Sequence, residues 1–328
     1  MNRLSVIVVF ALLAISAVSA GLTNTLRQRC RDDSGSGSFE NSGGSYDAFG
    51  YGSPQFNQSA FGYGQLPFKR AMPSRSGKVL PAMFDARRHW SQCKSIGMVM
   101  DQGCCSASHA LVPTAVMSDR MCIHSNGTMM KMFSALEPLL CCKECAMNPM
   151  DKCTGGSPTA VWKYWKEVGI VSGGPSANSK GCLPYPYQSN CLKQTCPNQC
   201  VPGSRMTMKT DRTKGVEVYR LNPSVQDIKM EIFERGPVET TIRVHLGLTM
   251  YKGGICREQM GPYLGNQSIK LIGWGMQEGV EYWLAVNSWG EMWGERGLLK
   301  LLAGQDHLGV ESNVHAGMPM ISRKSMDY

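Results

Sequence analysis

The chain has 328 residues, of which 42% are hydrophobic and 18% are charged, so it can form one large domain or two half-domains that share an interface. Its length excludes a small scaffold. The net charge of +9 is modest and the lysines and arginines are scattered, so we expect a solvated surface and no nucleic-acid partner.

Residues 1–20 have the pattern of a secretory signal peptide. Arg3 gives a charged start, an apolar run extends from Val6 to Ile15, and the small residues Val18–Ala20 end the segment. A membrane anchor needs a longer apolar stretch, and no later run is long enough to span a bilayer. We therefore expect a secreted, extracellular protein, with the lysosome or another vesicle lumen as the alternative.

Residues 21–78 form a segment of low complexity. Residues 33–75 are rich in Gly and Ser and almost without aliphatic side chains, and AFGYG occurs twice, at Ala48–Gly52 and Ala60–Gly64. Such a chain cannot bury enough apolar surface to offset its conformational entropy, so we expect it to be disordered. The sequence leaves open whether the segment is a featureless tail, self-associates weakly or is removed.

The composition is globular over residues 79–328, which we interpret as one domain. Apolar periodicity predicts three helices, at residues 108–120, 158–169 and 224–236. The second of them has an apolar stripe of Val161, Tyr164, Trp165 and Val168. Runs of β-branched and aromatic residues predict strands at 239–244, 268–272 and 281–286. Helices thus lie mostly in the first half and strands in the second, which indicates an α+β fold.

The chain contains 14 cysteines, most of them between residues 93 and 200. Because a secreted protein folds in an oxidising compartment, we expect disulfides rather than metal ligands. The spacing of Cys142 and Cys145, or of Cys196 and Cys200, would suggest zinc only in a cytosolic protein. We expect no metal and no other cofactor.

Eight segments, taken in order, resemble the papain-like cysteine peptidases, and cathepsin B most closely. They include DQGCCSAS at Asp101–Ser108, IGWG at Ile272–Gly275 and YWLAVNSWGEMWGERG at Tyr282–Gly297. The others lie at residues 80–93, 118–127, 169–174, 236–240 and 304–319. The resemblance implies a disulfide-rich papain-like α+β fold with a helical left lobe and a β-rich right lobe.

The family's catalytic groups can be carried over position by position. Gln102 matches the glutamine that holds the oxyanion, and Asn287 matches the asparagine that orients the catalytic histidine. Ser108 stands at the position of the nucleophilic cysteine, and Gln267, six residues before the first glycine of GWG, stands at that of the histidine. A hydroxyl without a base is a poor nucleophile, and an amide is not a base. The resemblance therefore implies an inactive homologue.

The alternative is an active endopeptidase that uses a non-standard nucleophile. His109 follows Ser108 directly, but neighbouring helical side chains point about 100° apart and do not face each other. Cys104 precedes the predicted helix by several residues, and no histidine is evidently placed to activate it.

The resemblance also implies five disulfides, namely Cys93–Cys122, Cys105–Cys153, Cys141–Cys196, Cys142–Cys145 and Cys182–Cys200. Four cysteines are left over, Cys30, Cys104, Cys191 and Cys256. Their pairing stays open, and bridging to another molecule is one use for them.

Three further positions concern ligand binding. Gly155 and Gly156 match the glycines that line the family's substrate cleft, so a peptide or protein ligand could bind there without being cleaved. A tight turn after Cys153 is an equally good explanation. Asn313 stands where cathepsin B has an acidic residue at the base of a specificity pocket, which argues against a preference for basic side chains.

Asn57, Asn126 and Asn266 begin glycosylation sequons. A glycan on Asn266, next to Gln267, would obstruct the family's cleft, but we expect this sequon to be buried and unused. The whole pattern predicts a secreted, inactive cathepsin B-like protein that acts by binding or as an extracellular structural component. The tubulointerstitial nephritis antigen group, matrix relatives of cathepsin B, is similar in its lost nucleophile, so the extracellular matrix is one candidate partner beside a peptide or protein ligand in the cleft.

Overall fold

The structure is a computed structural model that describes residues 65–69, 79–176, 178–186 and 195–321. Its first half contains β1 (Phe68–Lys69), β2 (Phe84–Asp85), α2 (Ala86–His89), η2 (Lys94–Gly97), α3 (Ser108–His124), α4 (Leu136–Cys141), β3 (Ala146–Asn148), β4 (Asp151–Gly156) and α5 (Pro158–Glu167). The second half contains α6 (Met208–Asp211), β5 (Gly215–Leu221), α7 (Val225–Arg235), β6 (Val238–His245), α8 (Leu246–Thr249), β7 (Ile255–Cys256), β8 (Tyr263–Gln277), β9 (Val280–Val286), β10 (Leu298–Leu302), η4 (His307–Gly309) and β11 (Val314–Pro319). The predicted signal peptide, the AFGYG copies, Asn57, Cys30 and Cys191 lie outside the described residues.

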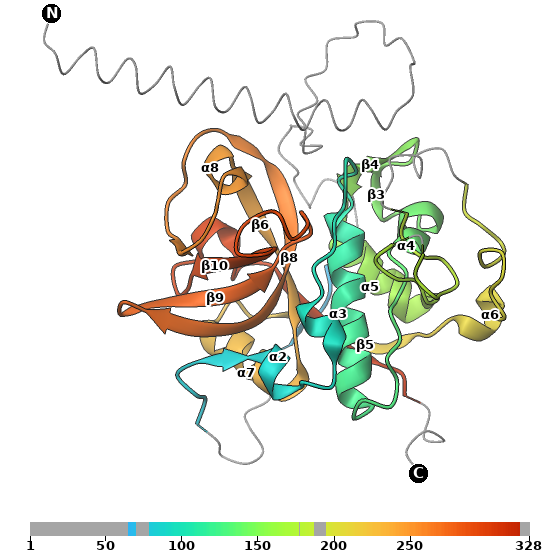
Figure 1. Cartoon of the computed structure of the whole chain (residues 1–328), viewed down its shortest axis with the longest axis horizontal. Coiled ribbons are helices and arrows are strands. Elements are labelled where there is room, and N and C mark those ends of the chain that lie inside the picture. Colours follow the sequence, from blue (N-terminus) through green and yellow to red (C-terminus); the bar gives the residue numbers. More distant parts are fainter. Residues whose placement is uncertain (1–64, 70–78, 177, 187–194, 322–328) are drawn as a thin grey trace, which may run out of the picture.

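A β-rich half and a helical half lie side by side, with α3 running between them (Figure 1). Within the described residues the β-rich half holds a nine-stranded sheet in the order β1-β5-β11-β6-β8-β9-β10-β7, with β2 paired to β8. The strands are antiparallel except for β1 with β5 and β7 with β10. The helical half contains α4, α5, α6 and the ladder of β3 and β4. The predicted α+β class is confirmed.

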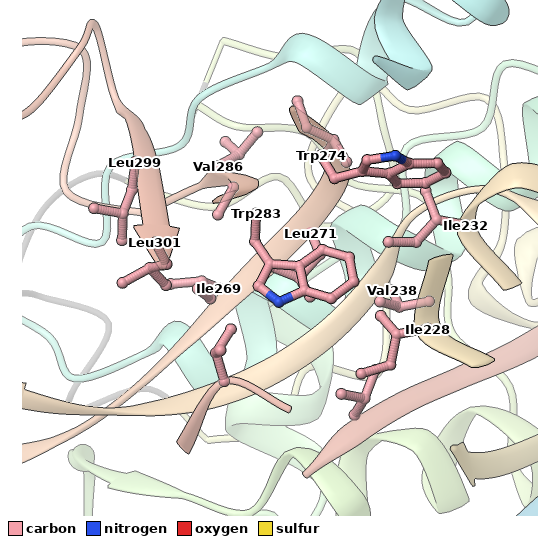
Figure 2. Close-up of a cluster of buried hydrophobic side chains, with 14 of the residues drawn as sticks. Ile228, Ile232, Val238, Ile269, Leu271, Trp274, Trp283, Val286, Leu299 and Leu301 are labelled. Atoms are coloured by element: carbon pink, nitrogen blue, oxygen red, sulfur yellow. The ribbon is translucent and has the colours of Figure 1, made fainter. Parts of the chain in front are cut away.

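Each half has its own hydrophobic core. In the β-rich half, Trp283 of β9 lies beside Leu271 of β8, with leucines of β10 on one side and Ile228 and Ile232 of α7 on the other (Figure 2). In the helical half, α3 packs against α5, whose Trp162 is completely buried. Burial of such side chains contributes roughly 1.5–3 kcal/mol each, so both halves are stable platforms for residues at their boundary.

Helix α3 contributes side chains to both cores, and almost all of its residues are buried, so it has no face directed to solvent. Its two buried charges are paired across the boundary. The Asp119 carboxylate accepts a hydrogen bond from Lys270 Nζ of β8 at 2.8 Å, and Arg120 Nη1 donates to Glu231 Oε1 of α7 at 2.9 Å. These ion pairs fix α3, and with it Ser108, against the β-rich half.

Two expectations from the sequence are wrong. Residues 65–69, which we assigned to the disordered segment, are ordered because β1 pairs with β5, Leu66 is buried in the core of the helical half, and Lys69 forms an ion pair with Glu217. Val168, assigned to the apolar stripe, is 40% exposed because α5 ends before it, and Trp162 is buried instead.

Five disulfides join the pairs that the resemblance implied, namely Cys93–Cys122, Cys105–Cys153, Cys141–Cys196, Cys142–Cys145 and Cys182–Cys200. Cys104 is also disulfide-bonded, whereas Cys256 is a free thiol. Within the described part of the chain, no helix is long and apolar enough to cross a bilayer, and no three His, Cys, Asp or Glu side chains are grouped to hold a metal ion.

Candidate active site

The predicted site residues come together at the N-terminus of α3. Ser108 is the first residue of the helix, and Gln102 precedes it in a loop that the Cys105–Cys153 disulfide ties to β4. Strand β8 supplies Gln267, and Asn287 follows β9. Ser108 is 6% exposed and Gln267 is 2% exposed. The site is therefore a buried contact between the two halves.

Gln267 is at the centre of a network of neutral hydrogen bonds. Its Nε2 donates to Gln102 Oε1 at 3.0 Å, to Asn287 Oδ1 at 3.0 Å and to Ser288 Oγ at 2.9 Å. The Ser288 hydroxyl donates to Gln102 Oε1 at 2.8 Å, and the Ser288 backbone N–H donates to Asn287 Oδ1 at 2.8 Å. An amide nitrogen carries two hydrogens, so one hydrogen is shared between two of these three acceptors, and the nitrogen accepts no proton near neutral pH. Gln267 thus serves this site as a donor.

The Ser108 hydroxyl oxygen accepts a hydrogen bond from the backbone N–H of Ser268 at 3.2 Å. All 6 histidines of the chain are described, and none has a hydrogen bond to Ser108, since their rings contact other groups. A general base must lie within hydrogen-bond reach of the proton that it removes. Among the described residues no base has this position relative to Ser108.

Gln102 is held rigidly, but one end of its amide stays available. Its Oε1 accepts the two hydrogen bonds from Gln267 and Ser288, while its backbone N–H donates to the Ser288 carbonyl at 2.9 Å and its backbone carbonyl accepts from the Tyr185 hydroxyl at 3.1 Å. Because the oxygen is engaged, the Nε2 end can donate to a carbonyl oxygen. This is the type of donor that stabilises an oxyanion or holds a peptide carbonyl.

His109 is adjacent to Ser108 in the chain but faces away from it. Its Nδ1 is 3.1 Å from the Ser106 carbonyl, so Nδ1 carries the proton, and Nε2 has no hydrogen-bond partner among the described residues. Burial lowers the pKa of His109 to about 4, although the contact with Ser106 acts in the opposite direction. The ring is neutral near pH 7, and the expectation that Ser108 and His109 form no dyad is confirmed.

Gly155 and Gly156 end strand β4, where Gly156 pairs with Ala146 of β3, so they do not form a tight turn after Cys153. Gly155 has a φ of +97°, in the region that favours glycine. A Cβ on Gly156 would lie 1.9 Å from the Cys145 carbonyl oxygen and 2.5 Å from His109 Nε2. Gly155 is therefore favoured by its backbone conformation, and Gly156 is required by the local packing.

Residues 80–318 match the family model described as papain family cysteine protease. The chain belongs to the papain family. The cathepsin B-like cysteine proteinase of Schistosoma japonicum is 36% identical over 255 residues, which cover 73% of each chain. A gut-specific cysteine proteinase of Caenorhabditis elegans is 37% identical over 246 residues, again 73% of each chain. The cathepsin B-like character inferred from the motifs is confirmed.

Solved structures of papain-family proteins have the same fold. ProCathepsin B S9 from Trypanosoma congolense gives a TM-score of 0.69 at 31% identity and covers 78% of this chain and 83% of its own. Digestive procathepsin L2 from the Tenebrio molitor larval midgut, with a TM-score of 0.62, 20% identity and coverage of 77% and 74%, shares the fold alone. The predicted papain-like fold is therefore correct.

The remaining predicted residues lie outside the hydrogen-bond network of this papain-family site. Asn126 and Asn266 are exposed, so the expectation that Asn266 is buried is wrong, because β8 continues past α3 at this point. Asn313 is half-buried just before β11, and its place in a specificity pocket stays a prediction. Cys104 is disulfide-bonded and offers no thiolate.

Two members of the network, Ser268 and Ser288, were not predicted. Each directly follows a predicted residue, Gln267 or Asn287, and this adjacency is the signal that the sequence offered. What each serine contributes depends on which of its groups points into the network, since Ser268 contributes its backbone N–H and Ser288 its hydroxyl. Residue types alone do not specify such directions.

Proposed function

We propose that this chain is a secreted, catalytically inactive papain-family protein that acts by binding a peptide or protein or as an extracellular structural component. The observation that carries the proposal is the direction of the hydrogen bonds at the N-terminus of α3. Gln267 donates where the family's base must accept a proton, and the Ser108 hydroxyl, which accepts from the Ser268 N–H, has no base among the described residues to take its proton. The proposed base position thus holds a donor, and the proposed nucleophile position holds a hydroxyl that is not activated.

The physics of the helix end also supports inactivity. A helix N-terminus stabilises negative charge, which lowers the pKa of a cysteine there and promotes thiolate formation. A serine hydroxyl has no accessible ionised form to benefit, and no side chain caps α3. In a hydrolase whose nucleophile and base act together, removal of either group lowers turnover on the order of a million-fold. Removal of both lowers it little further, because the two groups act as a unit.

Binding remains feasible because the contacts that hold a substrate do not need the reacting groups. The Nε2 end of the Gln102 amide is available as a donor, and Gly156 lies against His109 beside the same helix end. A peptide could be retained there without attack on its carbonyl. The signal-like residues 1–20, the five disulfides and the similarity to matrix relatives favour a secreted protein and an extracellular matrix partner.

A hydrolysis assay tests the proposal. Purified protein is incubated with fluorogenic peptides beside its Ser108→Ala variant, and we expect no difference between the two. The double variant Ser108→Cys with Gln267→His restores the family's reacting groups on the same scaffold, and we expect measurable turnover. Hydrolysis by the unaltered protein that is lost in Ser108→Ala would contradict the proposal.

A second candidate function is peptide hydrolysis through another nucleophile, and one group of side chains favours it. His315 Nδ1 lies 2.9 Å from Glu239 Oε2, and its Nε2 lies 3.2 Å from the Thr159 hydroxyl, an arrangement of hydroxyl, imidazole and carboxylate. The free thiol of Cys256 lies 3.9 Å from His307 Nε2, but burial raises its pKa. Activity that survives in Ser108→Ala but is lost in Thr159→Val or Cys256→Ser would favour this candidate.

A further inference from the structure

Strands β6 and β8 share a polar face. The register pairs Thr241 with Ser268 and Arg243 with Asn266. Alternate residues of a strand point to the same side of a sheet. One side of β6 therefore fills the core with Val238, Thr240, Ile242 and Val244, and the other side carries Glu239, Thr241, Arg243 and His245.

Helix α3 covers only one end of this polar face. Lys270 of β8 bonds to Asp119 inside the helix, and Ser268 bonds to Ser108, the first helical residue. Asn266 lies two residues further along the strand, about 7 Å beyond Ser268. It has passed the start of the helix, and both it and its partner Arg243 are exposed. The polar face therefore continues from Ser268, whose backbone N–H bonds to Ser108, into solvent, whereas the Gln267 side chain, on the register partner of Ile242, points to the other side of β8.

Basic side chains gather on the uncovered end. The Arg243 guanidinium packs against Gly309 of η4, and the His245 ring lies 5.9 Å from the ring of Tyr263. Burial lowers the pKa of His307, and the charges of Arg243 and His245 lower it further, so these three groups are within electrostatic reach of one another. Arg243 is therefore the permanent positive charge of this region, since a histidine with a lowered pKa is neutral near pH 7.

Among the described residues no carboxylate forms an ion pair with Arg243. The Glu258 carboxylate is within electrostatic reach of Cys256, which lies 3.9 Å from His307 Nε2. The neighbouring Asp306 carboxylate is engaged by the Glu311 backbone N–H and the Ser312 hydroxyl. Arg243 thus presents an exposed guanidinium that has no carboxylate partner among the described residues. It lies near the site where we propose that a peptide main chain binds. A carboxylate is the group that the planar donors of a guanidinium match best.

We propose that Arg243, His245, His307 and Tyr263 form a binding site for an acidic side chain of a peptide ligand whose main chain lies over the N-terminus of α3. This inference rests on the proposed binding function and defines the chemical class of its ligand. Arg243 supplies a bidentate donor and the Tyr263 hydroxyl a further one. Asn266, the register partner of Arg243, lies about 7 Å from Ser268 along β8, so we expect the acidic residue one or two positions from the peptide residue that lies over Ser108.

Peptide mixtures test the proposal with the full secreted chain. The probes are fluorescein-labelled heptapeptide mixtures in which one position is fixed as Glu, Gln or Lys and the others are randomised, and binding is measured by fluorescence anisotropy. At one position we expect Glu to bind about tenfold more tightly than Gln, with the advantage falling as salt is added. Arg243→Gln should remove this advantage and keep the binding of the Gln mixture. Arg88→Gln, which removes the same charge from an exposed arginine of α2, should preserve it.

The outcomes separate this proposal from the proposed function. Equal binding of Glu and Gln mixtures at every position, or a Glu advantage that survives Arg243→Gln, overturns the acidic site and leaves peptide binding intact. Failure of every mixture to bind overturns both the acidic site and the peptide-binding role. Mass spectrometry of the secreted protein gives a third check, because a glycan on Asn266 would cover its register partner Arg243, and full occupancy there would overturn the site.

Discussion

The two ends of α3 contact the β-rich half through different chemistry. Near its C-terminal end, Arg120 and Glu231 form a buried ion pair. At its N-terminal end, Ser108 and Gln102 meet Ser268 and Gln267 through neutral hydrogen bonds. The ion pair holds this part of α3 through contacts separate from those of Ser108. The replacement of reacting groups that we propose is therefore compatible with the fold, because the polar groups at the N-terminal end are paired with one another.

The charged end is stabilised by several donors around one carboxylate. Burial alone would raise the pKa of Glu231, but Arg120 and Arg235 lower it below its usual value, and the Tyr219 hydroxyl donates to Oε1 at 2.5 Å. Arg120 also donates to the Pro237 carbonyl at 2.8 Å. Each buried charge is thus satisfied only while its partners are present, and this end should be the more sensitive to substitution.

The largest expected effect comes from breaking the buried pair. Arg120→Met leaves Glu231 with one charged partner in a buried site, and we expect the free energy of unfolding to fall by about 3–5 kcal/mol. Lys300→Met, which breaks the partly exposed pair with Glu295, should cost less than about 1 kcal/mol. Urea unfolding followed by tryptophan fluorescence measures both. Equal losses would show that burial of the pair does not matter.

Acidification should destabilise the folded state through two histidines of α3, His109 near its N-terminal end and His124 at its C-terminal end. Burial lowers the pKa of His109 to about 4, and burial followed by the charge of Arg120 lowers that of His124 to about 4, from an ordinary value of 6.5. Between these pKa values the unfolded chain binds more protons than the folded one. The contribution of these two histidines to the free energy of unfolding is therefore fully present above about pH 6.5. It is lost as the pH falls toward 4, by up to about 3 kcal/mol per histidine.

Urea midpoints at about pH 7 and about pH 4.5 measure this loss. His109→Gln and His124→Gln should each make the midpoint less dependent on pH, because glutamine does not titrate. If the pH dependence of both variants matched that of the unaltered protein, the destabilisation at low pH would have another origin.

The neutral end should show the smallest effect. Gln267→Leu removes the donor to Gln102 Oε1 and Asn287 Oδ1, but Ser288 still donates to both oxygens. We expect a loss of about 1–3 kcal/mol in the free energy of unfolding, measured in the same urea experiment. Gln277→Leu on the same strand is the matched control and should change it by less than about 0.5 kcal/mol. A loss as large as that of Arg120→Met would contradict the distinction between the two ends.

Local signals predicted the helices better than the strands. The helix at residues 224–236 was bounded correctly because Ser224 caps it through its hydroxyl and Gly236 ends it with a φ of +104°, both consequences of nearby residues. The strand predicted at 268–272 extends over Tyr263–Gln277, because pairing with β6 and β9 determines its length. β1 was missed for the same reason, since its partner β5 lies about 150 positions away in the sequence.

The sequence by itself determined which reacting groups are present, because residue identity decides whether a thiol or an imidazole exists at positions 108 and 267, and it determined the five disulfide pairs by their likeness to a known family. Only the tertiary structure decided what the replacements do. Gln267 donates to Gln102 across 165 positions of sequence, and the direction of such a bond depends on how the two halves are placed. The same holds for Arg243, whose exposure beyond α3 follows from strand register and helix position rather than from its neighbours in the chain.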